Sequence, residues 1–132
     1  MQKYFEMALK EAKKAFKKDE IPVGAVIVKD SQIIAKSHNN RQKKHWIFGH
    51  AEINCILKAE KKIKDWRLDE CELYVTLEPC DMCKIFIKEA RIKKINYILT
   101  RNGKNINDTN VRKEICGEYK RLLQAFFENL RQ

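Results

Sequence analysis

Strand-length and helix-length segments alternate in the second half of the chain, and this alternation constrains the fold more than any other feature. Residues 72–77 alternate apolar and polar side chains, which predicts a strand, and residues 94–100 predict another. Between them, residues 81–90 have the length of a helix and follow Pro79, a residue favoured at helix starts. A strand–helix–strand unit favours parallel strands with the helix covering the sheet.

The first half of the chain adds a hairpin and two helices. Residues 4–18 carry apolar side chains at helical spacing, with lysines on the other face. Two apolar runs at 23–28 and 33–35 flank a polar turn, which predicts an antiparallel hairpin. Residues 50–62 and 118–130 return to helical spacing.

The order of these segments predicts an α/β protein, a three-layer α/β/α sandwich with a mixed sheet of four to five strands. A length of 132 residues suits one domain covering residues 1–132. We find no apolar leader and no run long enough to cross a bilayer, so we expect a cytoplasmic protein with no membrane partner. In that compartment its five cysteines are thiols or metal ligands.

Two motifs, His50-Ala51-Glu52 and the run from Pro79 to Cys83, carry the candidate chemistry. Cys80 and Cys83 are three residues apart at a predicted helix start, so both sulfurs can reach one ion. His50 begins another predicted helix and supplies a third ligand. Three protein ligands on zinc leave a fourth position for water, which is typical of a catalytic site. Zinc lowers the pKa of such a water to about 7.

Glu52 lies two residues after the proposed ligand His50 and can move protons without binding the metal. Each motif alone is weak, because a lone Cys-x-x-Cys also fits a structural zinc half-site or a redox pair. A structural site needs a fourth ligand at similar spacing, and a redox pair needs neither His50 nor Glu52. The remaining cysteines, Cys55, Cys71 and Cys116, fit ordinary buried thiols.

A net charge of +10, from 28 basic and 18 acidic side chains, favours a polyanionic partner such as nucleic acid. A lysine-rich solvated surface explains the same charge equally well. Charge alone therefore leaves the partner open.

The His-x-Glu and Pro-Cys-x-x-Cys pair is the signature of zinc deaminases. Nearly the whole chain resembles the bacterial tRNA-specific adenosine deaminases of the cytidine deaminase-like superfamily. The resemblance rests on the segments 21–26, 38–41, 50–53, 73–83 and 90–92, and on the paired phenylalanines near the C-terminus.

This resemblance implies hydrolytic deamination of adenosine to inosine at the tRNA wobble position, with one Zn²⁺ per subunit and a homodimer around the anticodon stem-loop. It also implies substrate contacts: Asn39 with the flipped base, Val23 and Ala51 lining its pocket, and Phe126 and Phe127 near the anticodon. Asn39 also fits a turn-forming role. Since Phe126 and Phe127 are adjacent, one helix face cannot bury both.

Three segments depart from the family pattern. The loop before His50 reads His45-Trp46-Ile47-Phe48-Gly49, and Asn102 stands where an aspartate is common. The stretch after Gly103 is shortened, and we expect residues 111–116 to keep a remnant of a fifth strand. These departures leave other substrates open: guanine, cytidine, or adenine in single-stranded DNA. A zinc-binding or RNA-binding module without catalysis is a further alternative.

Overall fold

The computed structural model of the protein describes residues 1–40, 49–102 and 111–130. Its strands form one mixed sheet in the order β2-β1-β3-β4. The strands are β1 (Gly24–Lys29), β2 (Gln32–His38), β3 (Cys71–Leu77) and β4 (Lys94–Leu99). The helices are α1 (Gln2–Lys17), α3 (Ala51–Ile63), α4 (Asp81–Glu89) and α5 (Lys113–Leu130).

Strand β1 pairs antiparallel with both β2 and β3, whereas β3 and β4 are parallel. The predicted hairpin and the predicted parallel strand–helix–strand unit are therefore both confirmed. The register brings the carboxyl ends of β3 and β4 to the same edge, because Leu77 pairs with Leu99. The chain leaving β3 at that edge leads directly to Pro79 and Cys80.

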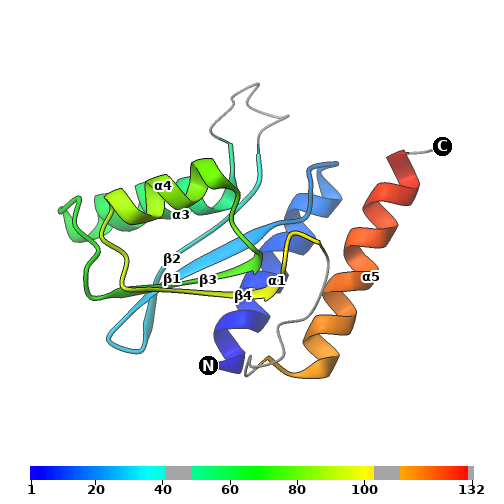
Figure 1. The fold of residues 1–132 in the computed structure, drawn as a ribbon, viewed down its shortest axis with the longest axis horizontal. Helices are drawn as coiled ribbons and strands as arrows, with labels where there is room; N and C mark the ends of the chain where they lie inside the picture. The colour runs from blue at the N-terminus through cyan, green and yellow to red at the C-terminus, as the bar shows by residue number, and fades with distance from the viewer. Residues whose placement is uncertain (41–48, 103–110, 131–132) are drawn as a thin grey trace.

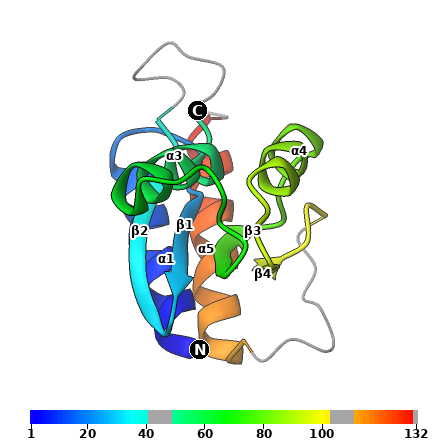
Figure 2. The same cartoon turned by 90° about the vertical axis from the view of Figure 1, so that its left-hand side faces the viewer.

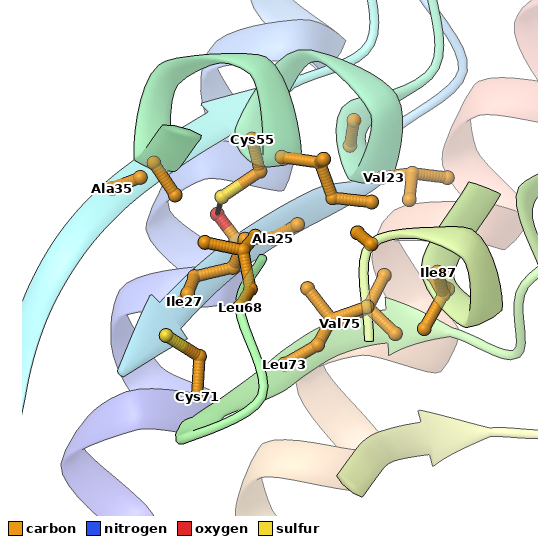
Figure 3. Packing of buried hydrophobic residues seen from close by; sticks show 14 residues of the cluster. Val23, Ala25, Ile27, Ala35, Cys55, Leu68, Cys71, Leu73, Val75 and Ile87 are labelled. Atoms are coloured by element: carbon orange, nitrogen blue, oxygen red, sulfur yellow. Dashed lines mark hydrogen bonds between the residues drawn. The ribbon is translucent and has the colours of Figure 1, made fainter. Parts of the chain in front are cut away.

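Two helices cover each face of the sheet, as the three-layer prediction required. Helices α3 and α4 lie over one face, and α1 and α5 lie over the other (Figures 1 and 2). Side chains of β1 alternate between the two cores: Ala25 and Ile27 pack under α3, whereas Val26 and Val28 pack against α1. Figure 3 shows the first of these cores, in which the buried Cys55 thiol donates to the Ala25 carbonyl at 3.6 Å.

Gly24 lets α1 approach the sheet closely at the start of β1. A Cβ atom there would lie 2.0 Å from the Ala8 carbonyl oxygen and 2.5 Å from the Ala12 nitrogen. The Gly24 amide donates to Thr76 Oγ1 on β3 at 3.1 Å. The start of β1 is thus fixed between α1 and β3, just after Val23.

The predicted strand remnant at residues 111–116 is wrong. Helix α5 begins at Lys113, and the amides of Ile115 and Cys116 donate to the Arg112 carbonyl. The physical reason is periodicity, since Ile115, Cys116 and Tyr119 continue the helical spacing and bury one face of α5. The sheet therefore has four strands among the described residues.

The unusual loop at 45–49 lies outside the described residues except for Gly49, and the shortened stretch at 103–110 lies wholly outside them. Among the helices that are described, none combines the length and apolar character that a membrane span requires.

Candidate functional site

Two helix starts on the same face of the sheet bring the predicted metal ligands together. His50 is the N-cap of α3 and Cys80 is the N-cap of α4, and both have extended backbone. His50 Nδ1 lies 3.9 Å from Cys80 Sγ and 3.4 Å from Cys83 Sγ. All three ligand atoms lie within 4.8 Å of one another. The extended caps thus aim both side chains at one point between the helices.

The spacing of these donors fits a zinc ion. Tetrahedral zinc, with bonds of about 2.1 Å to nitrogen and about 2.3 Å to sulfur, places such ligands roughly 3.6 Å apart. Burial raises the pKa of the Cys83 thiol, and the nearby charge of Glu52 raises it further. A deprotonated Cys83 beside the Glu52 carboxylate places two buried anions together, and only a strong positive charge would make that favourable. The donor set therefore suits a cation, and its two sulfurs and one imidazole are ligands that zinc prefers.

Glu52 lies in the first turn of α3 and is 3% exposed. Burial raises its pKa, although a hydrogen bond with Cys83 and the charge of Arg101 act in the opposite direction. Its Oε1 has no hydrogen-bond partner in the described part of the chain. An orphaned, buried carboxylate oxygen is costly in a merely structural position. It is available to a water or a substrate beside the metal ligands.

Asn39 lies directly behind the same helix start. Its side-chain Oδ1 accepts the backbone amide of Ala51 at 2.8 Å, and its backbone amide donates to the Val23 carbonyl at 3.1 Å. The donor Ala51 N–H fixes which side-chain atom is oxygen. Asn39 thus ties β2 to the residue after His50, so the turn-forming role and a substrate role are compatible. No described hydrogen bond uses its Nδ2 group.

Val23 and Ala51, the predicted pocket residues, belong to the core beneath α3. Ala51 is fully buried and Val23 is 6% exposed. They lie behind the metal ligands and the Asn39 contact.

The paired phenylalanines divide as the helical spacing required. Phe126 is 8% exposed, whereas Phe127 is 46% exposed, and their rings meet edge to face with centroids 5.4 Å apart. Phe127 lines a groove of about 630 Å³ together with Arg101 and Asn102. Leu77 and Leu99, the last residues of β3 and β4, also line the groove, so it extends to the edge where β3 leaves the sheet toward Cys80.

Sequence reasoning missed the contacts of Glu78. Its Oε1 accepts the Arg101 amide at 3.1 Å, its Oε2 accepts Lys84 Nζ at 3.2 Å, and its carbonyl accepts Arg101 Nη1 at 3.4 Å. Glu78 therefore joins the end of β3 to the residues after β4. A carboxylate directly before Pro79-Cys80 was the only signal in the sequence.

Relatives of known function match most of this chain. The chain is 45% identical over 94 residues to the tRNA-specific adenosine deaminase of Aquifex aeolicus (strain VF5), which covers 71% of this chain and 62% of that protein. The enzyme of the same name from Bacillus subtilis (strain 168) is 46% identical over 94 residues, covering 71% and 58%. The matched part of the chain therefore spans about three fifths of these curated relatives.

Solved structures share the fold. One, from a study of A-to-I editing by tRNA:A34 deaminases at the wobble position of transfer RNA, has a TM-score of 0.75 and 40% identity, covering 80% of this chain and 75% of that chain. The guanine deaminase of Bacillus subtilis has a TM-score of 0.73 and 37% identity, covering 76% and 64%.

The fold is thus the cytidine deaminase-like α/β fold of these neighbours, and the resemblance inferred from the sequence is confirmed. The family model for MafB19-like deaminases matches residues 1–131. By this match, the chain belongs to the MafB19-like deaminase family.

Proposed function

We propose that this chain binds one zinc ion per subunit and deaminates adenosine to inosine hydrolytically at the wobble position of tRNA. The observation that carries the proposal is the convergence of His50, Cys80 and Cys83 beside the buried, orphaned Oε1 of Glu52. Relatives named tRNA-specific adenosine deaminase support the choice of substrate.

The reaction replaces the C6 amino group of adenine with oxygen, consuming water and releasing ammonia. A zinc ion held by His50, Cys80 and Cys83 would supply a water whose pKa is lowered to about 7. Glu52 takes a proton from the attacking water and delivers it to N1 of the ring. It then carries the second proton to the departing amine. A buried carboxylate with a raised pKa suits this alternation between accepting and releasing a proton.

The rim of the site supplies groups that suit an RNA loop. The target base must leave its stack to enter a closed pocket, and this is least costly where bases are unpaired, as in an anticodon loop. We assign the Nδ2 group of Asn39 to the flipped base and the exposed ring of Phe127 to stacking with a neighbouring base. Val23 and Ala51 back the pocket, and Phe126 supports the ring of Phe127.

A second candidate is deamination of free guanine. It is favoured by the 37% identity to the guanine deaminase of Bacillus subtilis. Both reactions use the same proposed zinc and proton chemistry, so they differ only in what the rim of the site recognises.

The deciding experiment gives the zinc-loaded chain three substrates: an anticodon stem-loop with adenosine at the wobble position, the same loop as DNA, and free guanine. Inosine is measured by mass spectrometry after nuclease digestion, and xanthine is measured directly. We expect inosine in the RNA stem-loop. Turnover of guanine without turnover of the stem-loop would replace the tRNA proposal with the second candidate.

Metal analysis of two cysteine variants tests the proposed ligands. Cys83 and Cys116 are both buried, but Cys116 lies on α5, in the core on the other face of the sheet. Atomic spectrometry should find about one zinc per chain in the wild type and in Cys116→Ser, and a large loss in Cys83→Ser, which removes a thiolate ligand. Equal zinc in both variants would contradict the ligand assignment.

We also propose that the chain forms a homodimer and acts in the cytoplasm, where tRNA is the substrate. The resemblance to the tRNA-specific adenosine deaminases supports the dimer, and Ile85 on α4, which is 63% exposed, is a residue at which to test it. Light scattering should therefore find a dimer, and Ile85→Asp should shift it toward monomer. A monomeric wild type would end this part of the proposal.

A further inference from the structure

A cavity of about 450 Å³ lies beside the candidate site, on the other side of the chain segment that holds Asn39. Its walls come from three places: the end of α1, the end of β2, and the outer side of α3. Its polar lining includes Lys18, His38, Asn40, Asn54, Lys58 and Lys61. None of these residues belongs to the proposed deamination chemistry.

The lining of the cavity carries more positive than negative charge, with three lysines and one glutamate. In the part of the chain that is described, none of Lys18, Lys58 and Lys61 forms an ion pair with a carboxylate, and Lys58 Nζ donates to the Lys36 carbonyl at 3.2 Å. Glu20 is only 2% exposed, and its carboxylate offsets part of the positive charge. Three ammonium groups around one hollow repel one another unless an anion occupies it. The cavity is therefore built for negative charge.

His38 is held so that one ring nitrogen faces this charge. The buried carboxylate of Glu11 contacts His38 Nδ1 at 3.1 Å, and His38 Nε2 lies 3.4 Å from Lys18 Nζ. Glu11 thus fixes the His38 ring at the cavity wall, where the ring contacts the Lys18 ammonium group.

The cavity is coupled to the candidate metal site through Asn54. The Asn54 amide donates to the His50 carbonyl at 3.0 Å, and its Nδ2 donates to Asn40 Oδ1 at 2.9 Å and to the His38 carbonyl at 3.3 Å. Asn54 is one helical turn from His50, about 5.4 Å along the axis. The lysines lie farther away, since Lys58 and Lys61 are about 12 and 16 Å beyond His50 along the axis of α3. Phosphates along one strand of B-DNA recur about every 3.4 Å of rise, so several nucleotides span that distance.

We propose that this cavity binds a backbone phosphate of the nucleic-acid strand whose base is deaminated, an inference that rests on the proposed function. Lys58 and Lys61, one turn apart on α3, and Lys18 from the end of α1 hold the phosphate. Asn40 and Asn54 connect it to the segment carrying Asn39. The phosphate contact fixes the register of the strand, so that a base several nucleotides away reaches the metal site.

The test measures binding rather than turnover, so that its outcome is separate from that of the deamination assay. Zinc-loaded Glu52→Gln protein is titrated with a labelled anticodon stem-loop across a salt series. The pair Lys58→Gln/Lys61→Gln is compared with Lys62→Gln/Lys88→Gln, which removes the same charge from exposed lysines outside the cavity. We expect the cavity pair to weaken binding roughly 5- to 20-fold and to reduce the salt slope by about 0.7. Equal losses in both pairs would overturn the proposal.

A second arm identifies the phosphate. Single methylphosphonate substitutions on either side of the target adenosine remove one charge at a time. At one position, the substitution should weaken binding to the parent protein and leave binding to the cavity pair unchanged, because the two changes remove the same contact. If no position shows this coupling, the cavity does not hold the strand.

A third arm separates the strand from a free ion. Inorganic phosphate replaces chloride at constant ionic strength, and the Asn54 side-chain amide is followed by NMR. Weak perturbation by inorganic phosphate, together with strong perturbation by the stem-loop, supports the strand. Saturation by inorganic phosphate with no effect of the stem-loop would make the cavity a free-anion site and overturn the proposal.

Discussion

The centre of the candidate site and its rim are built in opposite ways. All four residues in the centre begin helices α3 and α4 or lie in their first turns, and Glu52 and Cys83 are buried. At the rim, Phe127 and Arg101 are exposed, and Arg101 lies beyond the end of β4. Regular elements fix the reacting groups, while the rim that meets the substrate is formed mainly at their ends.

This difference separates chemistry from recognition. A proton carrier must be held within hydrogen-bond reach of its target, and helix starts packed on a sheet provide that rigidity. Contacts to a flexible nucleic acid are numerous and individually weak. The loss of one contact therefore weakens binding and leaves the fold intact. Changes at the centre should therefore be large and confined to chemistry, and changes at the rim should be smaller and confined to binding.

The largest effect is expected at Glu52. Glu52→Gln keeps the shape of the side chain and removes its proton transfer, so the deamination rate should fall by about 10²- to 10⁴-fold. Zinc content should stay at the wild-type level, because Glu52 is not among the three clustered ligands. Both quantities are measured on the same preparation, with single-turnover deamination of the stem-loop as the rate.

Glu60→Gln is the matched control, since Glu60 lies on the same helix and is partly exposed. It should keep the wild-type rate. A Glu52→Gln rate within tenfold of wild type would break the distinction between centre and rim, because the buried carboxylate would then have no catalytic part.

The centre could be predicted from the sequence because its geometry is local. Cys80 and Cys83 lie within one helical turn, and His50 and Glu52 lie within another, so their spacing indicated three metal ligands with a carboxylate beside them. The sheet order supplied the remaining condition, which is that both helices cover one face. Strand-period and helix-period segments were sufficient for that, apart from residues 111–116, where β-branched side chains obscured a helical period.

The contacts at the rim could not be predicted, because they join residues far apart in the chain. Glu11 meets His38 across 27 positions, and Glu78 meets Arg101 across 23. Nothing in the local pattern of α1 indicates that one of its glutamates is buried. Such pairs appear only when the register of the hairpin and the position of α1 are known.

The two adjacent phenylalanines test the comparison within one helix. Phe126→Ala should lower the free energy of unfolding by about 3–5 kcal/mol, because it empties a packed position. Phe127→Ala should change it by no more than about 0.5 kcal/mol, as expected for an exposed side chain. Lost stacking should instead weaken stem-loop binding by about 1–3 kcal/mol.

Urea unfolding and fluorescence anisotropy measure the two quantities on both variants. The outcome that contradicts the assignment is the reverse pattern, with stability lost at Phe127 and binding lost only at Phe126.

Glu11 is a buried carboxylate that holds His38 at the wall of the cavity. Burial alone would raise its pKa, but hydrogen bonds and charges of Lys14 and His38 outweigh this and hold the pKa below its usual value of 4.5. Lys14 Nζ lies 2.7 Å from Oε2 in an ion pair. The lowered pKa means that Glu11 stabilises the fold above its unfolded-state pKa. This stabilisation is lost as the pH falls through the folded-state value.

Glu11→Gln should therefore lower the free energy of unfolding by about 1.5–3 kcal/mol at pH 7. The difference from wild type should shrink as the pH falls below 4.5, the usual carboxyl value. Urea unfolding at pH 7, 5 and 3.5 measures this, with the exposed Glu114→Gln as control. A difference that stays constant over this range would mean that Glu11 acts through packing and not through its charge.

The smallest effect is expected at Asn102, which is exposed and lines the groove beside Arg101. Asn102→Asp adds one negative charge to the groove that we propose for the strand, so single-stranded nucleic acid should bind less tightly. An exposed charge pair contributes about 0.2–1 kcal/mol, which corresponds to a loss of up to roughly fivefold. The loss should be greater at 50 mM salt than at 200 mM, because screening shortens the reach of surface charges.

Asn129→Asp is the control, since Asn129 is exposed on α5 and does not line the groove. Equal losses in the two variants would mean that the added charge acts through the net charge of the chain and not through the groove. If only Asn102→Asp weakens binding, and weakens single-stranded DNA more than the RNA stem-loop, then asparagine at this position broadens the range of strands accepted. The proposed zinc chemistry would be unchanged, because substrate range would be set at the rim, independently of His50, Cys80 and Cys83.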